Sequence, residues 1–202
     1  MRCLLFAWLP SGQGIWGVAL STALLTACSS GGGKDAAADA NAQNQQKIGA
    51  ADVTAKQEAD AKFLVKAASN ALLEVELGKL AQARARAAPV RAYGARLVQN
   101  RLELLATLRA LATAKSLVLP LALGGDEQSA YHEASVAAGT QLDKHVMDLL
   151  VKTQKQDEDA FDDLKDDAFD GDIRGFAAKY LRPIQEQLAA AKEADAAADA
   201  LP

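Results

Sequence analysis

The chain has 202 residues, of which 50% are hydrophobic and 24% are charged, and its formal net charge is −4. These values fit a globular domain and exclude collagen-like, disulfide-framework and fully disordered chains, since there are only 14 Gly and 2 Cys residues. A mildly acidic chain without a basic run is also a poor nucleic-acid binder, so we expect no nucleic acid among its partners.

Residues 1–27 have the pattern of a lipoprotein signal peptide. Arg2 precedes an apolar stretch at residues 14–25, which is too short to remain as a membrane-spanning helix. The stretch ends in LTAC at residues 25–28 and is followed by two serines, a pattern that resembles a bacterial lipobox. We therefore expect cleavage before Cys28 and acylation of its thiol. The alternative is an ordinary secretory signal with an incidental cysteine.

An acylated Cys28 would make the membrane a partner of this protein. Acyl chains anchor a protein durably, because each buried CH₂ contributes about 0.8 kcal/mol. Serine after the cysteine resembles the outer-membrane class of lipoproteins, so we expect the inner leaflet of the outer membrane, with the domain facing the periplasm. Residues 28–47 are polar and lack apolar periodicity, which predicts an acylated cysteine followed by a flexible tether.

Residues 48–202 are predicted to form an all-α domain, because apolar residues recur every three or four positions from about Asp60 onward. The first predicted helix runs through residue 87 and ends before Pro89, which suits the first turn of a new helix. The second predicted helix ends near Lys115, before a loop that contains Pro120 and the turn GGD at residues 124–126.

The second half of the domain repeats this helical pattern. A third helical region opens at Asp126, is interrupted at Gly139 and resumes at residues 142–164. A turn at residues 170–172 follows, with Asp172 as the expected N-cap of a last helix that Pro183 should kink. The pattern predicts a four-helix bundle in which two antiparallel hairpins are joined by a longer link.

Charge is distributed unevenly between the two halves. Residues 74–124 hold eight Lys or Arg against three Glu, whereas residues 126–172 hold four Lys against fourteen Asp or Glu. Complementary flanks of the two hairpins would explain this difference. The alternative is an exposed acidic face that concentrates divalent cations weakly. That face would comprise Asp157, Glu158, Asp159, Asp162, Asp163, Asp166 and Asp167.

The helical segments also resemble a known family. The stretches FLVKAASNALLEVELGK (63–79), VRAYGARLVQNR (90–101) and YLRPIQEQLAAAKEA (180–194), with residues 139–148, are similar to the ferritin-like bacterial family called domain of unknown function 4142. The resemblance covers about residues 57–195. Members are commonly labelled outer-membrane or exported proteins. The resemblance implies a ferritin-like four-helix bundle and no established activity.

Many members of that family resemble one another in carrying a histidine on the second, third and fourth helices. At those places this sequence has Arg101, Gln154 and Gln187, and it has Asn100 where an aspartate often precedes the first histidine. The histidines that the chain does have, His132 and His145, match none of the three places. We expect them to be ordinary surface or core histidines.

Spacing gives these positions a physical meaning. Arg101 and Gln187 fall on the apolar stripes of their helices, and counting residues from the two predicted turns brings Glu74 and Gln154 to a similar height. We therefore hypothesise a buried polar layer of Glu74, Arg101, Gln154 and Gln187, in which the guanidinium pairs with the carboxylate. The alternative is that Arg101 reaches the surface and the glutamines lie at helix flanks.

The sequence offers little for catalysis or for a cofactor. A carboxylate-bridged di-iron bundle needs Glu-x-x-His on two helices, and no such motif occurs. Residues 166–177 match a calcium loop only in part, since Ala177 stands where the bidentate Glu belongs. No phosphate loop, zinc spacing or nucleophile elbow is present.

We therefore expect no metal, no cofactor, no catalytic residues and no enzyme activity. The expected function is that of a lipid-anchored envelope protein that acts through surface contacts with an unidentified envelope partner. The alternative is a protein that binds a small ligand or a divalent cation, using the acidic third helix or a cavity between the hairpins.

Overall fold

A computed structural model describes residues 35–49 and 55–200 of the chain. The helices of this part of the chain are joined by turns and one longer connection without any strand, which confirms the predicted all-α class, and there are six of them in the described residues instead of the four expected. The helices are α1 (Ala36–Gly49), α2 (Ala55–Arg84), α3 (Ala88–Ala114), α4 (Gly125–Val136), α5 (Gly139–Asp167) and α6 (Gly171–Asp199). No helix within the described ranges combines the length and the apolar character that crossing a membrane requires. The predicted signal peptide and Cys28 lie outside the described residues.

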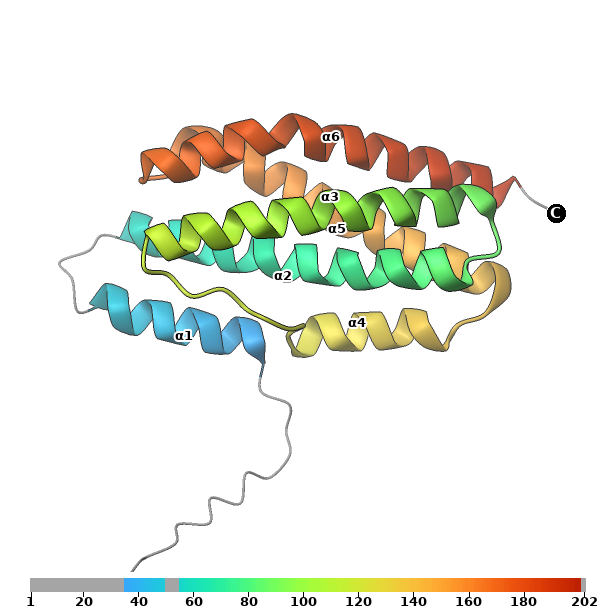
Figure 1. The fold of residues 1–202 in the computed structure, drawn as a ribbon, viewed down its shortest axis with the longest axis horizontal. Coiled ribbons are helices and arrows are strands. Elements are labelled where there is room, and N and C mark those ends of the chain that lie inside the picture. Colours follow the sequence, from blue (N-terminus) through green and yellow to red (C-terminus); the bar gives the residue numbers. More distant parts are fainter. Residues whose placement is uncertain (1–34, 50–54, 201–202) are drawn as a thin grey trace, which may run out of the picture. The chain divides into compact units, whose positions relative to one another are not determined.

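The four long helices form two hairpins that pack on each other (Figure 1). A short turn at residues 85–87 joins α2 to α3, and another at residues 168–170 joins α5 to α6. Across the hairpins, α2 contacts α5 and α3 contacts α6. The two shorter helices lie outside this group, where α1 and α4 both pack against α2 and α4 also contacts α5.

Helix α1 corrects the predicted tether over residues 36–47. Its Asn44 side chain donates to the carbonyl of Val118 at 2.9 Å and accepts from the Val118 amide at 2.7 Å. Asn44 and Ala40 are buried, and Asp35 caps the helix by accepting from the amide of Ala37 at 3.0 Å. The apolar pattern did not reveal this helix because its two buried side chains are an alanine and an asparagine, which are equally common in linkers.

The starts of α3, α5 and α6 follow from local chemistry. Pro89 lies in the first turn of α3, as expected. Gly139 has a φ of +58°, a left-handed conformation that glycine adopts without strain, and it separates α4 from α5 at the predicted break. The N-cap of α6 is Asp170 and not the predicted Asp172: its carboxylate accepts from the Asp172 amide at 2.8 Å, and a cap must precede the first helical residue, Gly171. Helix α6 continues through Pro183.

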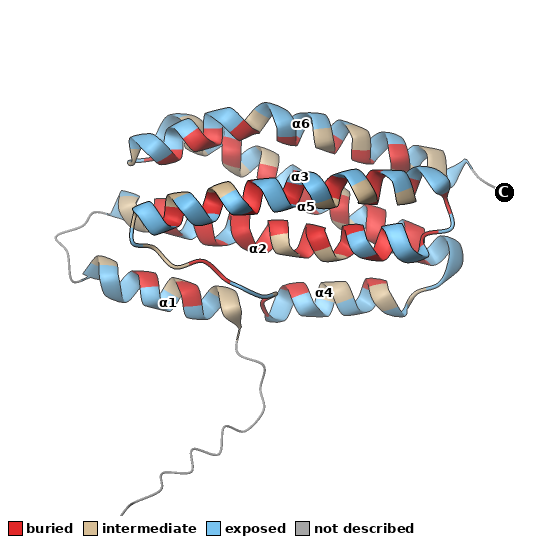
Figure 2. Cartoon of the chain, in the orientation of Figure 1, coloured by how far each residue is buried: buried red, intermediate tan, exposed pale blue. Residues whose placement is uncertain are grey.

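The core consists of two apolar clusters, and buried residues follow the faces that the long helices turn toward one another (Figure 2). One cluster contains the packed rings of Phe63, Phe161 and Phe176, and the other contains Leu77, Leu97 and Met147. The clusters meet near the middle of the long helices. The charged residues described below lie at that level.

The turns of the two hairpins are held by equivalent residues. Near the start of α2, Asp60 accepts from the amides of Phe169 and Asp170 and so holds the α5–α6 turn. Near the start of α5, Asp143 accepts from the amides of Arg86 and Ala87 and holds the α2–α3 turn. In the same way, Arg91 of α3 and Arg174 of α6 each donate to two carbonyls of the turn that precedes their helix.

These equivalent residues are separated by one constant interval: Asp143 follows Asp60 by as many residues as Arg174 follows Arg91. The shared interval and shared contacts indicate that the second hairpin repeats the first.

Candidate functional site

A charged cluster lies in the middle of the described domain, between the two apolar clusters. Nε of Arg101 on α3 contacts Oε2 of Glu74 on α2, and Nη2 of Arg101 donates to Oε1 of Glu74 at 3.2 Å. Nη2 also lies 3.7 Å from Oδ2 of Asp157 on α5. All three side chains are at most 2% exposed. One arginine therefore serves two buried carboxylates from two different helices.

Amide and hydroxyl groups complete the cluster. Asn70 of α2 donates to Oδ1 of Asp157 at 2.6 Å, and Gln154 of α5 donates to the hydroxyl of Tyr93 on α3. Glu74 and Asp157 are equivalent residues of the two hairpins, because they are separated by the same interval as Asp60 and Asp143. The arginine has no such counterpart, since Ile184 stands at its equivalent position.

The cluster holds two carboxylates and one guanidinium, and this ratio determines its electrostatics. Burial raises the pKa of Glu74 to about 8, against the opposing effect of the Arg101 charge. Burial likewise raises the pKa of Asp157, which the guanidinium also opposes. Two carboxylates share one guanidinium in a buried environment. At neutral pH the cluster therefore favours keeping one proton over ionising both carboxyl groups.

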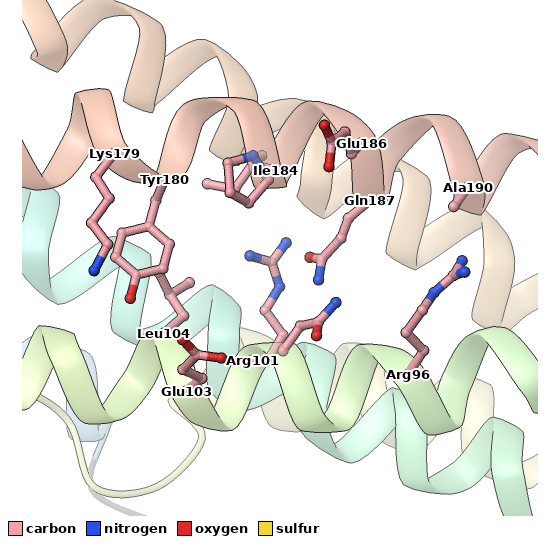
Figure 3. A pocket seen from close by; sticks show the side chains of 12 residues that line it. Arg96, Arg101, Glu103, Leu104, Lys179, Tyr180, Ile184, Glu186, Gln187 and Ala190 are labelled. Carbon is pink, nitrogen blue, oxygen red and sulfur yellow. The ribbon is translucent and has the colours of Figure 1, made fainter.

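The structure brings three of the four residues of the hypothesised layer together in the core: Glu74, Arg101 and Gln154. The fourth, Gln187, lies on α6 at the border of the core and is only partly buried. Its Oε1 atom is buried, however, and no hydrogen-bond partner lies near it. Gln187 and Arg101 line the same groove, which runs between α3 and α6 and has a volume of about 410 Å³ (Figure 3).

The predicted acidic face has to be corrected at one residue. Asp157 is only 2% exposed and belongs to the buried cluster, because it points into the domain from the inner side of α5. Glu158 is partly exposed, and the remaining five aspartates of the predicted face are exposed. Several of them pair with lysines of α5: Lys155 lies 2.8 Å from Asp159, and Lys165 lies 3.3 Å from Asp162.

Metal-ligating residues are dispersed in this part of the chain. Within residues 35–49 and 55–200, no group of three or more His, Cys, Asp or Glu side chains is placed to hold a metal ion. Both His132 and His145 are exposed on the surface.

Sequence reasoning missed three members of the cluster: Asn70, Tyr93 and Asp157. Each lies on the buried stripe of its helix, so a polar residue among apolar ones was the available signal. Asp157 was hidden by its acidic neighbours. Its position three residues after Gln154 and four before Phe161 could have placed it on the inner face of the helix.

Comparison with known proteins agrees with the resemblance read from the sequence. The model of the family described as "Domain of unknown function (DUF4142)" matches residues 42–194. No match was found among the curated proteins or among the solved structures. Since the matched range covers most of the chain, the protein belongs to the DUF4142 family.

Proposed function

We propose that this protein is a lipid-anchored, non-enzymatic protein of the cell envelope that acts through contacts with an envelope partner. In this proposal Cys28 carries the lipid, the membrane is the outer membrane, and the helical domain faces the periplasm. The support for the anchor is the LTAC–SS pattern at residues 25–30, which follows a short apolar stretch.

One observation supports a non-enzymatic domain. The polar side chains at its centre bind one another: Arg101 contacts Glu74 and Asp157, Asn70 donates to Asp157, and Gln154 donates to Tyr93. A nucleophile or a general base needs a lone pair that can reach a substrate, and a general acid needs a proton that can do so. One oxygen of each carboxylate accepts a hydrogen bond within the cluster, from Arg101 or from Asn70, and the second oxygen lies near the guanidinium without a hydrogen bond. Both carboxylates therefore face groups of the domain itself, and this favours a role in stability and specificity of packing.

We further propose that the four long helices form a ferritin-like bundle. The contacts of α2 with α3 and α5, and of α6 with α3 and α5, are those expected for two antiparallel hairpins packed side by side. The long connection between the hairpins, which contains α4, also fits this arrangement.

The chain provides a matched test of the anchor. The variants Cys28→Ser and Cys3→Ser each remove one of the two cysteines of the chain. We expect metabolic labelling with a palmitate analogue to mark the wild type and Cys3→Ser, and globomycin to block processing of both. Cys28→Ser should lose the label and leave the membrane fraction. A Cys28→Ser protein that stays labelled, or that pellets with membranes as wild type does, would overturn the proposal.

A further inference from the structure

The face formed by α3 and α6 has a groove along its middle that α1 and α4 do not cover. The groove has a volume of about 410 Å³, and the residues that line it all come from α3 and α6. Helices α1 and α4 lie elsewhere, since both pack against α2 (Figure 1). No described helix other than α3 and α6 therefore lines the groove.

Four exposed charges stand on the rims of this groove, two on each helix. Helix α3 carries Arg96 and Glu103, and α6 carries Lys179 and Glu186. In each helix the carboxylate follows the cation by seven residues, which is about two helical turns, so both side chains lie on the same side of the helix. The two pairs are equivalent, because the interval that relates the two hairpins also separates Arg96 from Lys179 and Glu103 from Glu186.

Helices α3 and α6 run in opposite directions, and each half of the groove therefore carries one cation and one carboxylate (Figure 1). In Figure 3, Lys179 and Glu103 lie to the left of Arg101. Arg96 and Glu186 lie to its right. The signs alternate both along each helix and across the groove.

These charges are available to another molecule. Within residues 35–49 and 55–200, Arg96, Lys179 and Glu103 form no ion pair, and Glu186 lies 2.9 Å from Arg182. Both members of that pair are more than half exposed. An exposed pair of this kind contributes at most about 1 kcal/mol, so Glu186 can exchange its partner at little cost.

The charge pattern is complementary to itself. If a second copy faces the first across a two-fold axis that runs along the helices, Arg96 of each copy lies opposite Glu186 of the other, and Lys179 lies opposite Glu103. If the axis runs across the helices in the plane of the face, Arg96 lies opposite Glu103, and Lys179 lies opposite Glu186. Each cation meets a carboxylate in both arrangements. Two cations and two carboxylates also balance, so the rims favour neither a small anion nor a small cation.

The face is large enough for a stable dimer. Two helices of 27 and 29 residues, side by side, give a face of roughly 40 by 20 Å. The resulting area of roughly 800 Å² per copy is the standard size of a specific interface.

We propose that the face formed by α3 and α6 joins two copies of this chain in a two-fold symmetric dimer, with Arg96 and Lys179 of each copy opposite the carboxylates of Glu103 and Glu186 of the other. An isologous interface must be complementary to itself, and the duplicated charge pattern meets this requirement. The dimer goes beyond the function proposed above and does not depend on the lipid anchor.

Photo-crosslinking of the full chain in cells tests the proposal. Asn100, which is exposed on the rim of the groove, is replaced by p-benzoylphenylalanine in two copies that carry different C-terminal tags. Irradiation should join the two tagged copies. The same photo-crosslinker at Gln156, an exposed position on α5, should give at least about tenfold less of this product. Equal yields at the two positions, or cross-links from Asn100 to other proteins in place of the second copy, would overturn the proposal.

Charge reversals test the pairing itself. The variant Arg96→Glu/Lys179→Glu makes the rims wholly acidic, and Glu103→Lys/Glu186→Lys makes them wholly basic. Each variant alone should cross-link to itself at least about tenfold less than the wild type does, because like charges then meet. Co-expressed, the acidic and the basic variant should cross-link to each other, and this product also shows that both are folded.

Two further variants complete the test. Lys144→Glu/Lys152→Glu, at exposed positions of α5, changes the net charge as much as the acidic variant does and should cross-link like the wild type. The milder Arg96→Gln/Lys179→Gln should retain the circular dichroism and melting temperature of the wild type and still lose cross-linking. Rim variants that cross-link to themselves like this α5 control, or folded acidic and basic variants that do not cross-link to each other, would overturn the proposal.

Discussion

The guanidinium of Arg101 contacts the carboxylate of Glu74 through both Nε and Nη2, and both side chains are almost entirely buried between α3 and α2. Taking two such charges out of water is costly, and the cost is recovered only when both find partners. A second carboxylate, that of Asp157, lies 3.7 Å from Nη2 of the same guanidinium. The cluster is therefore short of positive charge, and this shortage makes its stability sensitive to pH.

The first prediction concerns that pH dependence. Burial raises the pKa of Glu74 from 4.5 to about 8, so the folded state binds this proton more tightly than the unfolded state does. The contribution of this proton to the free energy of unfolding is complete below pH 4.5 and is lost as the pH rises through 8. The free energy of unfolding falls by no more than about 1.4 kcal/mol per pH unit in this range. Urea unfolding between pH 5 and pH 9 measures it, and Glu74→Gln should flatten the curve. An equally steep curve for Glu74→Gln would assign the dependence to other groups.

The second prediction concerns the close approach of α2 and α3. A Cβ atom on Gly94 would lie 2.7 Å from the carbonyl oxygen of Gly78 and 2.9 Å from Cβ of Ala81, so the helices would have to separate. We expect Gly94→Ala to lower the free energy of unfolding by about 1–3 kcal/mol. The control is Gly175→Ala in α6, where nothing lies within 4 Å of the new Cβ. It should stabilise the protein by up to about 1 kcal/mol, because alanine favours helix. A Gly94→Ala variant that is as stable as the wild type would contradict this close approach of α2 and α3.

The third prediction uses the two aspartates that hold the turns. Asp143 accepts from Arg86 and Ala87 at 2.8 and 2.7 Å, and replacing it by alanine leaves two amides without acceptors. Asp143→Ala and Asp60→Ala should each cost about 3 kcal/mol in thermal or urea unfolding. The two losses should add in the double variant, because the residues hold turns at opposite ends of α2. Asp163→Ala, at an exposed position, should change stability by less than about 0.5 kcal/mol. Losses as small as this control's would show that the turns do not need these carboxylates.

How much of the fold could be predicted from the sequence depended on the size of the buried side chains. The long helices were found because residues such as Leu64, Leu97 and Phe161 repeat every three or four positions. Helix α1 was missed because it is held by one asparagine amide and the small side chain of Ala40, which leave no apolar stripe. The cap at Asp170 was misplaced by two residues, since both aspartates beside Gly171 suit that role chemically.

The charged cluster shows the same limit. Spacing along the chain brought Glu74, Arg101 and Gln154 to one level, because a hairpin relates positions at equal distance from its turn. Asp157 was assigned to the surface because it lies within a run of acidic residues. Its spacing from Gln154 and Phe161 was the available signal for the inner face of α5, where Asn70 donates to it at 2.6 Å.

The central claim is that Arg101 is the counter-ion of two buried carboxylates, and a comparison of backgrounds tests it most directly. In the wild type, Arg101→Met should lower the free energy of unfolding by about 3–5 kcal/mol, because Glu74 and Asp157 lose their cation. In the background Glu74→Gln/Asp157→Asn the buried guanidinium has itself lost its counter-ions, so the same change removes an uncompensated charge and should cost at least about 2 kcal/mol less. Equal costs in the two backgrounds would show that Arg101 contributes through packing alone, and would contradict the claim.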